Sequence, residues 1–190
     1  MPAAPSREPR PAGQAGNDPE TVADLGEFGL ISALTGDLVQ PPTTLLGPGD
    51  DAAVVAAPDA RVTVTTDVLV EGVHFRLDWS TPEQIGRKAA AVNLADVAAM
   101  GATPTALLVG LVCPPTTPAE TVLGIGRALR EETEVAGAAI VGGDVTAGPV
   151  IVLAITAMGN LGGRPPVTRA GARPGDVGAL CGTVGRAATG

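Results

Sequence analysis

The spacing of hydrophobic residues along the chain predicts a regular succession of helices and strands. Apolar positions three or four residues apart, each set preceded by a residue that favours a helix start, predict helices over 21–35, 80–100 and 117–137. Alternating or continuous apolar runs predict strands over 52–57, 61–67, 105–113, 138–141 and 150–158. This order predicts an α+β fold in which a mixed β-sheet carries the two main helices on one face.

Local signals predict where these helices begin and which face they bury. Thr81, Pro82 and Gln84 predict a capping box at the start of the second helix, and Thr117 with Glu120 predicts another at the third. The first helix is expected to present one apolar face, formed by Leu25, Phe28 and Ile31.

Turn residues predict the connections between strands. A Pro-Asp pair separates the strands over 52–57 and 61–67, and we expect these strands to pair as a hairpin. Alternation in the second of them places Thr65 and Asp67 on one face. The sequence Gly-Gly-Asp at 142–144 is typical of a turn after the strand over 138–141.

Proline and glycine mark the ends of the predicted domain. Residues 1–20 hold five prolines and two glycines without apolar periodicity, and we expect a disordered leader there. Residues 21–160 form the expected N-terminal domain. Residues 161–190 are expected to hold a linker and the beginning of a truncated second domain, whose first strand is predicted over 177–181.

Composition excludes several classes of function. The 12 basic and 20 acidic residues give a net charge of −8, and the chain has only two phenylalanines and one tryptophan, so nucleic acid is not an expected partner. The longest apolar run, over 150–158, is too short to span a bilayer, so no membrane contact is predicted and the expected location is cytoplasmic. Cys113 and Cys181 lack a metal-binding spacing and are expected to be reduced thiols.

An aspartate interrupts the apolar side of the second helix. Helical spacing places Asp96 between Ala89 and Val92, so we expect its carboxylate to point inward. Asn93 lies three residues before it and can help to orient it. A buried charge requires a cation, hydrogen-bond donors or a proton. Asp96 is therefore either a structural acid satisfied by backbone amides or part of a site.

Further aspartates lie at the ends of predicted strands, where ligand-binding groups are common. These are Asp50, Asp51, Asp67 and Asp144, and Asp50 also suits an ordinary turn. Two carboxylates within 4 Å repel by about 4 kcal/mol at an effective dielectric of 20, so converging acids favour a divalent cation such as Mg²⁺. No P-loop is present, and the glycines at 124 and 126 favour close helix packing over nucleotide binding.

Four motifs in this order and spacing resemble the thiamine-monophosphate kinase family. They are GPGDDAAVV at 47–55, TTDVLVEGVHF at 65–75, GRKAAAVNLADVAAMGATP at 86–104 and VGGDVTAGP at 141–149. The family is part of the wider superfamily of aminoimidazole-ribonucleotide synthetase-like ATP-binding proteins. RAGARPGDVGALCGTVG at 169–185 is similar to the family's link into its second domain.

The resemblance implies transfer of the γ-phosphoryl group of ATP to thiamine monophosphate, assisted by several Mg²⁺ ions and without a dedicated general base. It implies that the metal ligands are Asp51, Thr65, Thr66, Asp67, Asp96 and Asp144. It also implies that ATP contacts Gly143, Asp144 and Arg169, and that His74 contacts the thiamine phosphate. Family members pair through this domain's sheet, so a homodimer with a barrel-like interface is expected.

Two other functions stay open at this stage. The first is a related enzyme that uses ATP to activate an amide or carbamoyl oxygen. The second is a non-catalytic module that dimerises and binds magnesium polyphosphate, because the family's remaining ligands lie in a second domain that these 190 residues do not include.

Overall fold

The computed structural model describes residues 19–180 and 182–185, and its elements follow the predicted order except for a short strand over 44–46 and a 3₁₀ turn over 169–171 that were not predicted. They are α1 (Val22–Thr35), β1 (Thr44–Leu46), β2 (Val54–Val55), β3 (Thr63–Val70), α2 (Pro82–Ala99), β4 (Thr103–Cys113), α3 (Ala119–Val135), β5 (Ala139–Ala147), β6 (Val152–Asn160) and the short 3₁₀ helix η1 (Arg169–Gly171). None of the helices in these described residues is long and apolar enough to cross a membrane.

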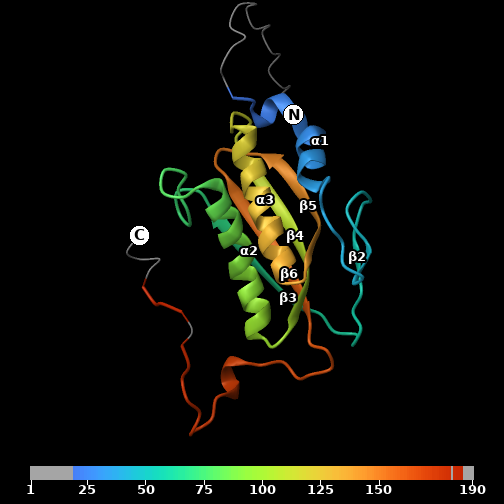
Figure 1. Cartoon of the computed structure of the whole chain (residues 1–190), viewed down its shortest axis with the longest axis vertical. Coiled ribbons are helices and arrows are strands. Elements are labelled where there is room, and N and C mark those ends of the chain that lie inside the picture. The colour runs from blue at the N-terminus through green and yellow to red at the C-terminus, as the bar shows by residue number, and fades with distance from the viewer. Residues whose placement is uncertain (1–18, 181, 186–190) are drawn as a thin grey trace, which may run out of the picture.

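A four-stranded mixed sheet forms the centre of the fold, with the strand order β3-β6-β4-β5. β4 and β5 are parallel, whereas β6 is antiparallel to both β3 and β4. Figure 1 shows α2 and α3 side by side on one face of this sheet, with α1 beside α3. This arrangement confirms the predicted α+β fold with two main helices on one face.

The helix face of the sheet holds the main hydrophobic core. Alternate residues of β6 are buried there, including Leu153, Ile155 and Ala157. They pack against the buried side of α2 and α3, which includes Ile85 and Leu129. Burial of this apolar area fixes the helices against the sheet.

Glycines let α3 pack closely against both α2 and α1. A Cβ atom on Gly86 of α2 would overlap the backbone carbonyl of Ile125 in α3. A Cβ atom on Gly124 would lie 3.0 Å from the Pro82 side chain of α2, and one on Gly126 would overlap the side chain of Leu34 in α1. The predicted packing role of the glycine pair at 124 and 126 is therefore confirmed.

The start of α2 follows the predicted capping box. The Thr81 side chain accepts a hydrogen bond from the Gln84 amide at 3.3 Å, and the Gln84 side chain accepts one from the Thr81 amide at 3.0 Å. The box predicted for α3 is wrong, because Pro118 is its N-cap and makes no side-chain cap bond. Thr117 is instead buried.

Three further predictions of local structure are wrong. The strands on either side of the Pro-Asp turn do not pair, because β2 pairs with β1 and β3 pairs with β6. In α1, Phe28 is 84% exposed, since Gly26 with a φ of 69° interrupts the helix and changes the face that follows. Residues 142–144 form no turn, because β5 runs continuously through them.

The ends of the chain add two further outcomes. Of the expected leader, residues 1–18 lie outside the described part, while the carbonyl of Glu20 accepts a hydrogen bond from the Ala119 amide at 2.8 Å. Glu20 is thus tied to α3. The strand predicted over 177–181 is not formed in residues 177–180, and Cys181 lies outside the described residues.

Candidate functional site

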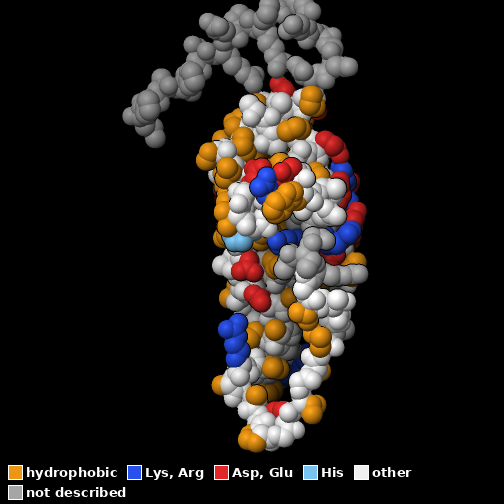
Figure 2. All heavy atoms as spheres, turned by 90° about the vertical axis from the view of Figure 1, so that its left-hand side faces the viewer, with side chains coloured by type: hydrophobic (Ala, Val, Ile, Leu, Met, Phe, Trp, Pro, Cys, Tyr) orange, Lys and Arg blue, Asp and Glu red, His pale blue; other side chains and the backbone are white. Residues whose placement is uncertain are grey.

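Two of the candidate residues meet where β3 lies along α2. The Thr65 hydroxyl donates a hydrogen bond to the Asp96 carboxylate at 3.3 Å. Successive side chains of a strand point to opposite faces, so Asp67 lies on the same face of β3 as Thr65. The structure therefore brings Thr65, Asp67 and Asp96 to one edge of the sheet, as the alternation predicted for the two β3 residues. Figure 2 shows this side of the molecule, with acidic side chains below the single histidine.

The orientation predicted for Asp96 is wrong. Its side chain is exposed, and the buried polar residue of α2 is Asn93, with 0% exposure. The buried stripe of α2 includes Ala89, Asn93 and Val97, which are four residues apart. That spacing was the available signal for Asn93, because residues at i and i+4 lie on one face of a helix.

Thr66 lies on the other face of β3 from Thr65. Its hydroxyl donates to the Ile155 carbonyl at 3.0 Å and accepts a hydrogen bond from the Thr156 hydroxyl at 3.2 Å. The structure thus does not bring the Thr66 hydroxyl together with Thr65 and Asp96.

A second set of candidates lies at the opposite edge of the sheet. Gly143 and Asp144 belong to β5, and Asp51 lies in the segment before β2. All three line one cavity of about 910 Å³ between this segment, β5 and β4. Asp50 also lines the cavity, and its carboxylate accepts a hydrogen bond from the Asp51 amide at 3.0 Å. Asp50 thus orders the turn that presents Asp51.

The glycine at 143 is required by the sheet itself. A Cβ atom there would overlap the carbonyl oxygen of Val109 in β4. This close approach explains why a side chain is excluded within a continuous strand, where the sequence favoured a turn. The backbone of Gly143 is consequently open on the cavity side without a turn.

The candidate acids form two groups. Asp67 and Asp144 lie on β3 and β5, the outer strands of the sheet, and three strand spacings of about 4.8 Å place these strands roughly 14 Å apart. Among the described residues, no three His, Cys, Asp or Glu side chains come together as a ready metal site. The acids therefore flank the sheet instead of converging on a single point.

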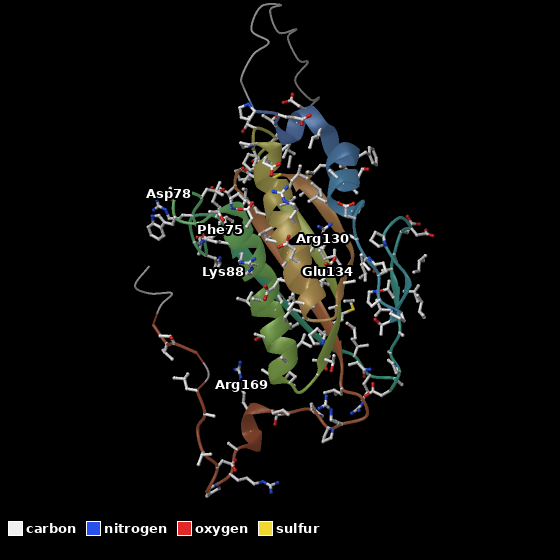
Figure 3. All side chains as sticks on the ribbon, viewed as in Figure 1. Phe75, Asp78, Lys88, Arg130, Glu134 and Arg169 are labelled. Atoms are coloured by element: carbon white, nitrogen blue, oxygen red, sulfur yellow. The ribbon has the colours of Figure 1, made fainter. Side chains whose placement is uncertain are left out.

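His74 lies in the loop that follows β3. Its Nδ1 accepts a hydrogen bond from the Val70 amide at 3.0 Å, so the neutral ring carries its proton on Nε2. The Lys88 ammonium of α2 donates to the His74 carbonyl oxygen. Figure 3 shows Lys88 on α2 close to Phe75, which is buried and anchors the loop. The exposed imidazole is thus presented with one free donor atom.

The same loop carries an ion pair at its tip. The Arg76 guanidinium bonds both oxygens of Asp78, at 2.9 and 2.7 Å, and holds the pKa of that carboxyl below its usual value. Arg76 also lies over the ring of Trp79, 4.5 Å from its centre. The charges of Arg76 and Asp78 are therefore matched within the loop.

Arg169 is exposed and lies at the C-terminal end of α2, as Figure 3 shows. The segment that carries it is bonded to that end, since the Val167 amide donates to the Met100 carbonyl at 3.0 Å. The Arg164 guanidinium also donates to the Gly101 carbonyl at 2.9 Å. Arg169 and His74 thus lie towards opposite ends of α2.

The buried thiol belongs to the core and not to either acidic group. Cys113 ends β4 with 2% exposure, and burial raises the pKa of its thiol. A thiol of this kind is inert, in agreement with the prediction of an ordinary reduced cysteine.

The donor atoms of the two acidic groups fit a hard divalent cation. They are carboxylate and hydroxyl oxygens, and Asp51, Asp96 and Asp144 are exposed to water. Mg²⁺ prefers oxygen ligands, retains water and binds through few carboxylates together with phosphate oxygens. Two small acidic groups therefore suit magnesium held jointly by protein and a polyphosphate.

Comparison with known proteins places this fold in a family. Residues 49–161, more than half of the chain, match the N-terminal domain of AIR synthase related proteins. The chain belongs to this family. It is 51% identical over 170 residues to the thiamine-monophosphate kinase of Mycobacterium tuberculosis H37Rv, a match that covers 90% of this chain and 51% of the relative. The chain thus spans about half the length of the curated relatives that it matches.

Solved structures agree with this relationship. A thiamine-monophosphate kinase from Stenotrophomonas maltophilia K279a is 38% identical, with a TM-score of 0.56 over 68% of this chain and 39% of that one. A structure described as AaThiL complexed with AMPPCP and TMP is 27% identical, with a TM-score of 0.50 over 72% of this chain and 42% of that one.

Proposed function

We propose that this chain acts in a thiamine-monophosphate kinase, which transfers the γ-phosphoryl group of ATP to thiamine monophosphate and releases thiamine diphosphate and ADP. The observation that carries the proposal is the 51% identity over 170 residues to a relative of that name. The complex of AaThiL with AMPPCP and TMP supports ATP and thiamine monophosphate as ligands. We place the protein in the cytoplasm, where ATP is available.

The reaction requires the protein to neutralise the charge of the two phosphates, and it does not require proton transfer. The acceptor is a phosphate oxygen that is already ionised near neutral pH, so the main obstacle is repulsion between two anions. Bound Mg²⁺ would supply the neutralising charge that lets the two phosphates approach. No residue of the chain is needed as a general base.

The two acidic groups divide the binding task. Asp67 and Asp96, with the Thr65 hydroxyl, would hold magnesium at the β3 edge. Asp51 and Asp144 would hold it at the β5 edge, beside the open backbone of Gly143. Because the groups lie on opposite edges of the sheet, a polyphosphate and more than one ion are needed to connect them. Thr66 would take part only through its backbone, since its hydroxyl is bonded on the other face.

Two further residues extend the site along α2. The Nε2–H of His74 is the donor that would bind the phosphate of thiamine monophosphate. Arg169, near the other end of α2, would bind ATP as the charge complement of its phosphates. In these assignments His74 and Arg169 mark the two ends of the site, and the reacting phosphates would meet between them.

The exposed face of the sheet supports a homodimer. Val64 and Val68 of β3 are 63% and 47% exposed, on the face opposite α2. Apolar side chains on an exposed sheet face favour association with a second copy. A dimeric mass in analytical ultracentrifugation is expected, and a monomer at all concentrations would contradict the dimer.

The direct test is turnover by the chain with single acids neutralised. Thiamine diphosphate formed from ATP, thiamine monophosphate and Mg²⁺ is measured by chromatography. Asp96→Asn and Asp144→Asn are each expected to abolish Mg²⁺-dependent product formation without unfolding the domain, because each removes an ion-binding charge. Asp37→Asn is the matched control, since its side chain is 89% exposed and paired with Arg130.

Because the chain covers only about half of its relatives, a second function is also favoured. With 51% of the relative matched, the chain alone could act as a dimerising module that binds magnesium polyphosphate. Calorimetry with Mg²⁺ and AMPPCP separates the two: binding without turnover favours the module. ATP consumption that does not require thiamine monophosphate would instead favour a related ATP-dependent enzyme, and would contradict the kinase.

A further inference from the structure

Asn93 is a polar side chain where the fold needs an apolar one. It is 0% exposed and lies in the buried stripe of α2, between Ala89 and Val97. A polar amide transferred from water into such a place costs free energy unless its hydrogen bonds are made. Its presence therefore calls for specific partners.

Both ends of the Asn93 amide have partners. Its Nδ2 donates to the Ala89 carbonyl at 3.0 Å, within α2. Its Oδ1 accepts a hydrogen bond from the backbone amide of Asp67 at 3.0 Å. Asn93 thus joins the helix to the strand that lies beside it.

The bond to Asp67 ties an outer strand of the sheet to the helix. β3 is paired only with β6 in the four-stranded order, so no second strand holds its other side. The Asn93 side chain therefore supplies a specific contact that holds β3 against α2.

A second contact joins the same two elements, along the line of contact between β3 and α2 that we call the seam. Thr65 is two residues before Asp67 on β3, and Asp96 is three residues after Asn93 on α2, and the two are hydrogen-bonded. The bonds 67–93 and 65–96 together fix how far α2 is displaced along β3. That displacement sets the separation of the Asp67 and Asp96 carboxylates.

We propose that Asn93 is a positioning residue that holds the Asp67 backbone against α2 and thereby sets the Asp67 and Asp96 carboxylates for one divalent ion. This inference rests on the proposed function for its ion, but the bond itself concerns only the fold. Asn93 is not expected to touch the ion, because it is fully buried and both its polar atoms are bonded within the protein.

The chain offers a matched control in Thr133 of α3. This residue is also 0% exposed, and its hydroxyl donates to the Leu129 carbonyl of its own helix at 2.7 Å. Thr133→Val removes a buried hydrogen bond next to the core without breaking a bond between helix and sheet. Thr133→Val therefore measures only the general effect of losing a buried hydrogen bond in the core.

The experiment compares Asn93→Leu with Thr133→Val in the 190-residue chain. Mn²⁺ is the probe, and its dissociation constant is measured by electron paramagnetic resonance. Asn93→Leu is expected to weaken Mn²⁺ binding about tenfold, as the loss of residues that orient metal ligands does elsewhere. Thr133→Val is expected to leave it unchanged, because it lies outside the seam.

Amide hydrogen exchange by NMR supplies a readout that needs no ion. The Asp67 amide is expected to be protected in the wild type and to exchange much faster in Asn93→Leu than in Thr133→Val. A scalar coupling from the Asp67 amide nitrogen to the Asn93 side-chain carbonyl carbon tests the bond in the wild type, even if Asn93→Leu does not fold.

The outcomes separate the two proposals. An unprotected Asp67 amide in the wild type, or equal loss of Mn²⁺ binding in Asn93→Leu and Thr133→Val, would overturn the role of Asn93. A wild type that binds no Mn²⁺ would overturn both the ion site of the proposed function and the positioning of carboxylates for it. A wild type that binds Mn²⁺ but forms no thiamine diphosphate would count against the kinase alone, and leaves the Asn93 result standing.

Discussion

The two edges of the sheet present their acids in different ways. At the β3 edge, side chains connect strand and helix through the bonds of Asn93 to Asp67 and of Thr65 to Asp96. At the β5 edge, Asp144 and Asp51 line a cavity but make no hydrogen bond to each other. The first edge is arranged by side-chain bonds between a strand and a helix. The second is arranged mainly by the course of the backbone, and its Asp50 carboxylate bonds only the neighbouring Asp51 amide.

This difference indicates that the two halves of the candidate site respond to different kinds of mutation. The β3 edge should be sensitive to the loss of single hydrogen bonds, because these set its geometry. The β5 edge should be sensitive to added bulk, because glycine lets its strand approach β4 so closely. Added bulk at Gly143 and loss of the Thr65 hydroxyl test the two sides of this contrast.

The largest effect is expected from added bulk at the β5 edge. In Gly143→Ala the new Cβ atom overlaps the Val109 carbonyl oxygen, which is backbone and cannot move aside. We expect a loss of about 2–3 kcal/mol in the free energy of unfolding, measured with urea. Gly142→Ala is the neighbouring control, since its Cβ atom meets only the flexible Leu108 side chain at 3.3 Å. Equal stability of the two variants would contradict the backbone role of Gly143.

A smaller effect is expected from a single hydroxyl at the β3 edge. Thr65→Val removes the bond to Asp96, which is worth about 1 kcal/mol, so Mn²⁺ binding should weaken about fivefold. Thr66→Val is the matched variant, because its hydroxyl lies on the opposite face and bonds Ile155. We expect Thr66→Val to leave the dissociation constant unchanged. The same loss in both variants would show that the face of the strand does not decide ligand binding.

The smallest effect concerns the ion pair of Arg61 and Asp59 in the segment between β2 and β3, where Arg61 lines the same cavity as Asp51 and Asp144. Arg61, bonded at 2.7 Å, and the Gly163 amide lower the pKa of Asp59. Because the folded pKa is the lower one, the stabilisation is fully present above the unfolded pKa of about 3.9 and is lost as the pH falls through the folded value. Asp59→Asn should therefore unfold slightly more easily than the wild type at pH 7, and the difference should shrink as the pH falls below about 3.9. A difference that does not shrink in acid would show that the carboxylate charge is not its cause.

Local signals in the sequence predicted most of the elements but not all of their partners. The capping box at the start of α2 was found because Thr81 and Gln84 lie within one helical turn. The pairing of β3 with β6 was not found, since a Pro-Asp turn favours a local hairpin while the partner lies far along the chain. Phe28 was misplaced because Gly26 breaks the helical repeat on which the prediction depended.

The candidate site was partly accessible from the sequence. Alternation correctly placed Thr65 and Asp67 on one face of β3, because that rule depends only on the strand. The inward direction of Asp96 was wrong, because the buried face of α2 includes Asn93 and Val97 and leaves Asp96 outside it. The division of the acids between two edges could not be predicted, because it depends on the order of strands in the sheet.

The contact of Gly86 with the Ile125 backbone has a consequence for how this sequence can vary. Any larger residue at 86 would push α2 away from α3. The contacts of α2 with β3 would be disturbed as a result. Position 86, which holds no proposed ligand, should therefore tolerate almost no replacement in a randomised library. Selection on the fold would then appear there as a steric restriction, without any chemistry at the residue itself.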